Sequence, residues 1–129
     1  MKINYIALTI CLIFMSCNSQ NPSEKLEGKD WEVIQIEDVS EFSKAPIITF
    51  NVKENKVSGN TGCNNFFGEL NLEDNKLTLG KMGATKMLCS DMTAEDLFFK
   101  ITDRIAMFKF EDDRLVLLSE DNELLMILQ

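Results

Sequence analysis

Residues 59–68 read Gly-Asn-Thr-Gly-Cys-Asn-Asn-Phe-Phe-Gly, and residues 85–89 read Thr-Lys-Met-Leu-Cys. The first stretch interrupts the regular backbone, because glycine and asparagine favour turns and left-handed conformations that other residues avoid. Its two phenylalanines then lead back into a strand-like pattern. We expect Cys63 and Cys89 to meet in space, so that the two segments are tied together.

Alternating apolar and polar residues around these segments predict a series of β-hairpins. The alternation is clearest at Ile48, Phe50 and Val52. Turns are predicted at residues 54–55, 73–75 and 112–113. Strands joined by such turns form an antiparallel sheet.

Three further segments complete the predicted sheet. Residues 31–36 predict a first strand, with the only tryptophan, Trp31, in the core rather than stacked on a ligand. Trp31, Val33 and Gln35 share one face of this strand. The runs 115–118 and 124–128 are apolar on both faces, which is typical of strands that lie under a helix or line a curled sheet. Residues 80–88 are rich in Met and Gly and predict a loop.

One helix is predicted after Cys89. Thr93 is expected to cap it, with Asp96 three residues later in an approximate capping box. Phe98 and Ile101 begin an apolar stripe at helical spacing that continues to residue 108. A chain of this length needs that stripe for its own core, so we expect the helix to pack on the sheet.

The N-terminus has the features of an export signal. Lys2 precedes an apolar run over residues 5–15, and Ser16 and Cys17 follow. The run is shorter than the ~20 apolar residues of a membrane span. A small residue before cysteine resembles a bacterial lipobox, although Phe14 stands where Leu is usual. The resemblance implies cleavage before Cys17 and acylation of its thiol.

This export signal predicts how the chain divides into segments and where the protein is located. The segments are a lipoprotein signal peptide over residues 1–16, a flexible tether over 17–25 and one domain over 26–129. No run of acids directly follows Cys17, and in some bacterial groups such a run marks export to the cell surface. We therefore expect a membrane-anchored, periplasm-facing protein, with the outer membrane favoured over the inner.

The composition excludes several classes of function. The chain has 21 acidic and 13 basic residues, a formal charge of −8, and no histidine. An acidic surface repels phosphate backbones, which argues against nucleic-acid binding. Without histidine there is no Ser-His-Asp or Cys-His catalysis and no His-ligated zinc. We expect no enzyme activity, no metal, no cofactor and a monomeric protein.

Two cysteines remain for the domain, because Cys11 leaves with the signal and Cys17 is the lipid site. An oxidising export compartment favours a structural disulfide between Cys63 and Cys89. Two buried, inert thiols are one alternative. A redox-active or metal-binding pair is the other, although Cys-x-x-Cys spacing and a cation cluster are missing.

The other residues of the first stretch also allow two interpretations. Asn60, Asn64 and Asn65 are expected to form turns through their own side chains, with a polar ligand site as the alternative. The glycines predict bulges or bends rather than a phosphate loop, because no Gly-Lys-Ser/Thr motif follows and no helix starts there.

The two segments together resemble the META domain family, which includes HslJ-like heat-shock lipoproteins. The pattern is Ser-Gly-x-x-Gly-Cys-Asn over residues 58–64, followed by Thr-x-Met-x-Cys over 85–89. The motif residues are Gly62, Cys63, Asn64, Asn65, Phe66, Gly68, Thr85, Met87 and Cys89. The sequence departs from the family at Asn65, where Arg is common, and after Cys89, where Pro often follows. These departures put a shared anion contact in doubt, but not the fold.

The resemblance implies both a fold and a function. The fold is a small α+β domain with a strongly curved antiparallel sheet of about seven or eight strands, close to an open barrel, and one helix across it. The function is a non-catalytic binding or stabilising module of the bacterial envelope, associated with heat stress and antibiotic tolerance. The expected partners are the membrane, through lipidated Cys17, and an envelope protein or an apolar ligand.

Two other functions are kept as alternatives. One is a thiol–disulfide redox protein that uses Cys63 and Cys89. The other is a carrier of an apolar ligand inside the sheet.

Overall fold

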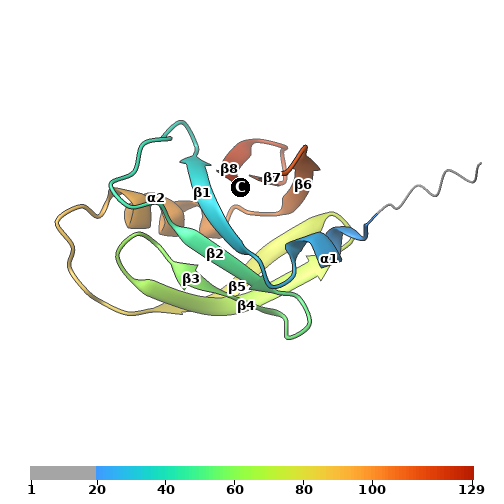
Figure 1. Cartoon of the computed structure of the whole chain (residues 1–129), viewed down its shortest axis with the longest axis horizontal. Helices are drawn as coiled ribbons and strands as arrows, with labels where there is room; N and C mark the ends of the chain where they lie inside the picture. The colour runs from blue at the N-terminus through green and yellow to red at the C-terminus, as the bar shows by residue number, and fades with distance from the viewer. Residues whose placement is uncertain (1–19) are drawn as a thin grey trace, which may run out of the picture.

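The computed structural model describes residues 20–129, which form eight antiparallel strands and two helices (Figure 1). The predicted signal peptide and Cys17 lie outside the described residues. The elements are α1 (Pro22–Leu26), β1 (Asp30–Ile36), β2 (Ile47–Asn51), β3 (Lys56–Asn60), β4 (Asn65–Glu73), β5 (Lys76–Ala84), α2 (Thr93–Thr102), β6 (Met107–Glu111), β7 (Arg114–Leu118) and β8 (Leu124–Leu128). The predicted α+β class, with a strongly curved antiparallel sheet and one main helix, is confirmed.

The sheet closes into a ring, which goes further than the open barrel that the resemblance implied. Each strand pairs with its neighbour in the sequence, and β8 pairs with β1 from Val33 opposite Leu128 to Ile36 opposite Met126. The weakest seam lies between β5 and β6, where the register contains the single pair Lys76 and Met107. The connection that carries α2 joins the two strands of this seam. Neither described helix is long and apolar enough to cross a membrane.

Tight turns set the order of the strands. Asn55, Asp74 and Asp112 have φ angles of 54°, 53° and 54°. Asn and Asp adopt this left-handed region more readily than other side chains, and such turns match the twist of a hairpin. The turns at 73–75 and 112–113 lie where the sequence placed them, whereas the first turn spans residues 52–55 rather than the two residues 54–55.

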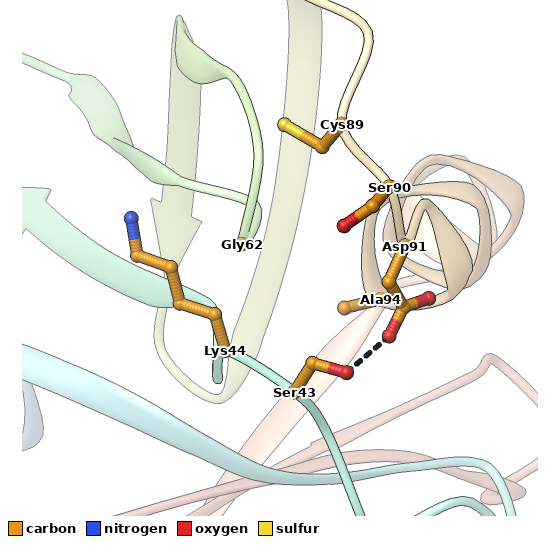
Figure 2. A pocket seen from close by; sticks show the side chains of 7 residues that line it. All are labelled: Ser43, Lys44, Gly62, Cys89, Ser90, Asp91 and Ala94. Carbon is orange, nitrogen blue, oxygen red and sulfur yellow. Dashed lines mark hydrogen bonds between the residues drawn. The ribbon is translucent and has the colours of Figure 1, made fainter.

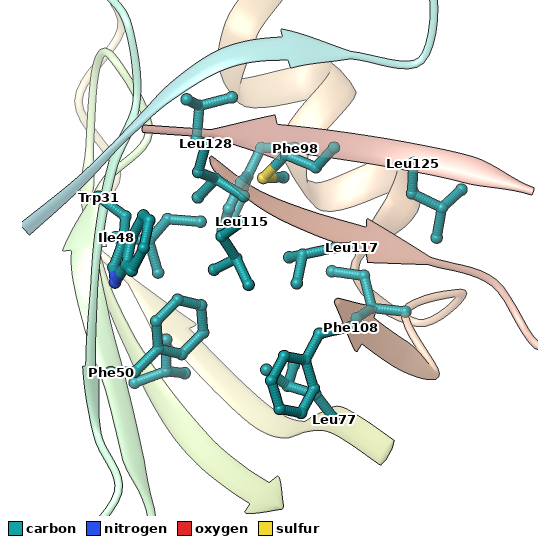
Figure 3. Packing of buried hydrophobic residues seen from close by; sticks show 14 of the residues in the cluster. Trp31, Ile48, Phe50, Leu77, Phe98, Phe108, Leu115, Leu117, Leu125 and Leu128 are labelled. Carbon is teal, nitrogen blue, oxygen red and sulfur yellow. The ribbon is translucent and has the colours of Figure 1, made fainter. Parts of the chain in front are cut away.

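Large apolar side chains fill the interior of the ring (Figure 3). Trp31, Phe50 and Leu117 have no exposed surface, and Trp31 is a core residue as predicted. All of Leu115–Leu118 are buried, which explains why this run is apolar on both faces. Burial of apolar surface on this scale is the main stabilising term of a small domain.

Two strands differ from the sequence prediction. The simple alternation placed Ile36 opposite Trp31, yet both side chains are buried in one core, because a register shift between Val33 and Gln35 moves Ile36 to the inner face. The loop predicted from residue 80 is wrong up to Ala84, since β5 continues that far. There the ring of Phe67 lies over Gly83, where an added Cβ would be 2.7 Å from Cζ.

Both helix starts also differ from expectation. Thr93 is the first residue of α2 rather than its cap, and the Asp91 carboxylate accepts the Thr93 N–H at 3.0 Å. The expected Thr93–Asp96 capping box is therefore wrong. Residues 22–26 form the short helix α1, which overlaps the last four residues of the segment 17–25 that was expected to be a tether. Asn21 accepts the Ser23 N–H at 3.4 Å, and Pro22 occupies a position that needs no N–H donor.

Candidate functional site

A disulfide joins the two segments that the sequence singled out. The Cys63 and Cys89 sulfurs are 2.01 Å apart, and the two Cα atoms are 5.9 Å apart. Cys63 lies in the turn between β3 and β4, and Cys89 lies in the loop between β5 and α2. The bond therefore fastens the loop of residues 85–92 to the sheet, as predicted.

The side chain of Asn64 is the centre of the site. It is 2% exposed. Its Oδ1 accepts the Met87 N–H at 2.6 Å and the Thr85 hydroxyl at 2.9 Å. Its Nδ2 donates to the Met87 carbonyl at 3.0 Å and to the Glu95 carboxylate at 2.9 Å. One amide thus joins the β3–β4 turn, the 85–92 loop and the first turn of α2.

The neighbouring polar residues complete the turn. The Asn64 N–H donates to the Thr61 hydroxyl at 3.1 Å, and the Thr61 N–H donates to the Asn64 carbonyl at 2.9 Å. Asn60 accepts the Gly62 N–H at 2.9 Å and donates to the Asn65 side chain at 2.9 Å. The Asn60 bond to Gly62 is the turn bond expected of asparagine. The same expectation is wrong for Asn64, whose side chain bonds residues distant in the sequence.

Gly62 is required by two features of the turn. Its φ angle is +99°, which L side chains rarely adopt. A Cβ at this position would also lie 2.7 Å from the Lys44 carbonyl oxygen. The conformation and the close approach both exclude larger residues.

Phe66 and Gly68 complete the motif on β4. The Phe66 and Phe98 rings pack with centroids 4.7 Å apart, which connects β4 to the buried face of α2. At Gly68 an added Cβ would be 2.7 Å from the Met82 side chain, so this glycine permits close packing against β5. The motif residues therefore act from one contiguous part of the fold.

Glu95 is the residue whose role sequence reasoning missed. Glu95 is only 7% exposed, and the Asn64 side chain donates to its carboxylate. The carboxylate lies in the first turn of α2, where the helix dipole favours negative charge. Glu95 lies three residues before Phe98, on the helix face of the apolar stripe, and this spacing was a signal for burial. Its partner lies 31 residues away and could not be found locally.

A polar cleft of about 130 Å³ opens beside Cys89 (Figure 2). It is lined by Ser43, Lys44, Gly62, Cys89, Ser90, Asp91 and Ala94. The Ser43 hydroxyl and then the Thr93 N–H hold the pKa of Asp91 down to about 2, so this carboxylate is ionised at neutral pH. The Lys44 side chain points away from Asp91 (Figure 2).

The chemistry available in the cleft is limited. A Ser43–Asp91 hydrogen bond has no histidine to act between the two groups, because the sequence contains none. Within residues 20–129, no three His, Cys, Asp or Glu side chains lie close enough to hold a metal ion.

The sequence profile of the META domain matches residues 24–129. The chain belongs to the META domain family. Most motif residues of this META domain meet at the disulfide and at Asn64, while Phe66 and Gly68 pack β4 against α2 and β5.

Two solved structures share the fold of this META domain, and a third matches it less closely. A protein from Burkholderia xenovorans, determined by NMR, is 19% identical with a TM-score of 0.60, over 81% of this chain and 83% of that one. A second NMR structure is 23% identical with a TM-score of 0.62, over 81% and 92% of the two chains. A DUF4847 family protein from Bacteroides vulgatus is 16% identical with a TM-score of 0.47, over 64% and 57%. No curated protein matches the sequence.

Proposed function

We propose that this META domain is a non-catalytic binding or stabilising module, exported and held at a bacterial envelope membrane by a lipid on Cys17. The proposal rests on the bonds that the motif residues make within the domain. Cys63 is bonded to Cys89, and both polar atoms of the Asn64 side chain are hydrogen-bonded within the domain. Sulfurs joined in a disulfide and an amide whose two polar atoms are hydrogen-bonded stabilise a surface rather than react with a substrate.

Side chains fill the interior of the ring, which supports binding at the outer surface over carriage of an apolar ligand inside the sheet. Phe50, Leu77 and Leu115 occupy the space between the strands and are not exposed (Figure 3). Ligand cavities usually measure roughly 300–1,000 Å³ and bury most of the ligand. The cleft beside Cys89 measures about 130 Å³, and the larger hollows, of about 320 to 450 Å³, are open to solvent rather than enclosed within the ring.

The N-terminal sequence supports export and acylation, with the domain facing the periplasm and the outer membrane favoured. The test is labelling of growing cells with a fatty acid that carries a detectable tag. We expect labelled protein in the membrane fraction, and we expect Cys17→Ser to abolish both the label and the membrane association. A Cys17→Ser protein that stays in the membrane fraction would contradict the lipid anchor.

The link to envelope stress is tested in a deletion strain. We expect the strain to survive heat and envelope-active antibiotics less well than its parent, and we expect the wild-type gene to restore survival. The Cys17→Ser gene should restore it only poorly, because the module then lacks its position at the membrane. Unchanged survival of the deletion strain would count against the stress role.

A thiol–disulfide redox protein remains the second candidate, because Cys89 borders an open cleft from which another thiolate could approach. The reduction potential of the disulfide separates the two functions. Structural disulfides have potentials below about −300 mV, whereas catalytic pairs lie near −270 to −120 mV. We expect the lower range, and a potential in the upper range would favour the redox function.

A further inference from the structure

The loop between β5 and α2 carries the most exposed apolar side chain of the described residues. Leu88 is 94% exposed and its neighbour Met87 is 56% exposed. The loop lies at the end of the molecule opposite α1 (Figure 1). Single exposed apolar residues are common and need no explanation by themselves. The important question is therefore whether the loop holds these two side chains in place.

Bonds on both sides fix the backbone at this point. Asn64 is bonded to both the N–H and the carbonyl of Met87, at 2.6 and 3.0 Å. Cys89 is held by the disulfide to Cys63. Leu88 is the single residue between these two attachments. A partner that buries Leu88 would lose little backbone freedom of the loop, and this preorganisation strengthens binding.

We propose that Met87 and Leu88 form a docking finger that enters an apolar pocket of an envelope protein, and that acidic side chains border this pocket. The acidic border of the pocket is inferred from the positive charge beside the finger. Lys86 precedes the finger and is exposed, and Lys44 lines the cleft beside Cys89. Neither lysine takes part in the ion pairs found among residues 20–129. Carboxylates at the rim of the pocket would complement both.

Charge also favours a protein over a lipid surface as the partner. Anionic headgroups would also attract the two lysines, so the number of basic residues decides between the two kinds of partner. Peripheral binding to such headgroups usually requires about four to eight clustered Lys or Arg residues. Lys86 adjoins the finger and Lys44 lines the neighbouring cleft, where the ionised Asp91 also lies, so the surface falls short of that number.

The position of the finger in the molecule also favours a protein partner over the membrane. This inference rests on the proposed function, through the lipid anchor at Cys17. The described chain begins at the α1 end, three residues after Cys17. A lipid on Cys17 would place the membrane at that end, and the loop that carries the finger lies at the opposite end of the molecule (Figure 1).

The test begins in the cells from which the gene comes. A photo-crosslinking amino acid replaces Leu88 in the full-length protein, and a matched variant carries it at Leu124, which is 36% exposed on β8. We expect a single protein adduct from position 88 and none of that mass from position 124. The protein identified from the adduct is then purified, and its affinity for the full-length chain is measured.

The affinity measurement decides the proposal. We expect Leu88→Ser and Lys86→Glu each to weaken binding by tenfold or more, and Leu124→Ser to leave it unchanged. Leu88 is almost fully exposed, so its substitution should leave the melting temperature unchanged and separate lost binding from lost folding. An affinity that does not respond to Leu88→Ser overturns the docking finger.

The other crosslinking results also overturn it. An adduct with phospholipid, or Leu88-dependent binding to vesicles of phosphatidylethanolamine and phosphatidylglycerol, would assign the finger to a lipid surface. An adduct of twice the chain mass would assign it to a second copy, and the absence of an adduct would remove the partner. Failure of the lipid anchor is seen separately, as a wild-type chain that carries no fatty acid label while its adduct persists.

Discussion

The side-chain nitrogen of Asn64 lies 2.9 Å from both carboxylate oxygens of Glu95. The two residues come from different layers of the fold, the β3–β4 turn and the first turn of α2. Both are buried, at 2% and 7% exposed. Because the same amide accepts the Met87 N–H through its oxygen, the position needs a donor and an acceptor on one short side chain. Among the amino acids of this size, asparagine meets that need.

Asn64→Asp is therefore expected to be strongly destabilising. It replaces the donor by a second carboxylate facing Glu95, so that two buried acids oppose each other without a hydrogen bond between them. We expect the free energy of unfolding at pH 7 to fall by roughly 3 kcal/mol or more. Urea unfolding followed by circular dichroism measures this.

Asn65→Asp is the matched control for this change. Asn65 is exposed, and its side-chain oxygen accepts from Asn60, a bond that a carboxylate keeps. We expect a change of less than about 1 kcal/mol. Equal effects of the two substitutions would contradict the central role of Asn64. In the Asn64→Asp, Glu95→Gln double variant, part of the lost stability should return, because one of the two charges is removed.

The disulfide should contribute a large part of the stability of the domain. It joins residues separated by 26 positions, and the loop-entropy relation gives ~3.5 kcal/mol for such a closure. We expect Cys63→Ser or Cys89→Ser to lower the melting temperature by about 10 °C or more. Calorimetry under oxidising conditions measures this, and the reduced wild-type protein should melt close to the variants. Equal melting of the oxidised wild type and the variants would reject the structural role.

Gly62→Ala should be more damaging than the same change at Gly28. Both glycines have a positive φ angle, +99° at Gly62 and +65° at Gly28. A Cβ at Gly28 meets nothing within 4 Å, whereas at Gly62 it lies 2.7 Å from the Lys44 carbonyl oxygen. We expect a loss of ~1 kcal/mol at Gly28 from backbone strain alone. At Gly62 we expect ~2–4 kcal/mol, because strain and a steric clash combine. Equal losses at the two positions would show that the close approach does not matter.

Local signals in the sequence were sufficient for most of the fold. The turns at Asn55, Asp74 and Asp112 could be predicted, because positive φ angles in short hairpin turns depend on the turn residues themselves. The apolar runs of β7 and β8 could be predicted for a similar reason, since burial on both faces is visible in composition. The cysteine pairing followed from their number and the expected compartment.

The features that the sequence did not predict depend on partners distant in the chain. The shift in β1 that buries Ile36 is set by its pairing with β8. The last residues of β5 contain Gly83, which reads as a loop until the ring of Phe67 covers it. The sequence predicts Thr93 as the helix cap, whereas the structure starts the helix at Thr93, because the bond from its N–H to Asp91 depends on how the preceding residues bend. The Asn64–Glu95 contact needs the complete fold, so the sequence identified the motif residues without the network that they form.

The Ser43–Asp91 hydrogen bond makes a prediction about acid stability. The hydroxyl of Ser43 and the N–H of Thr93 lower the pKa of Asp91 from 3.8 to about 2. A carboxyl whose pKa is lower in the folded state binds its proton more readily when the protein unfolds. Its contribution to stability is thus complete above pH ~4 and is lost as the pH falls towards 2. We expect Asp91→Asn to be less stable than the wild type at pH 6, with a difference that shrinks steadily between pH 4 and pH 2.

Urea unfolding across this pH series measures the difference, and Asp121→Asn, at an exposed acid in the β7–β8 turn, provides the control. A difference between the wild type and Asp91→Asn that stays constant or grows as the pH falls would show that the hydrogen bonds do not favour the ionised carboxyl.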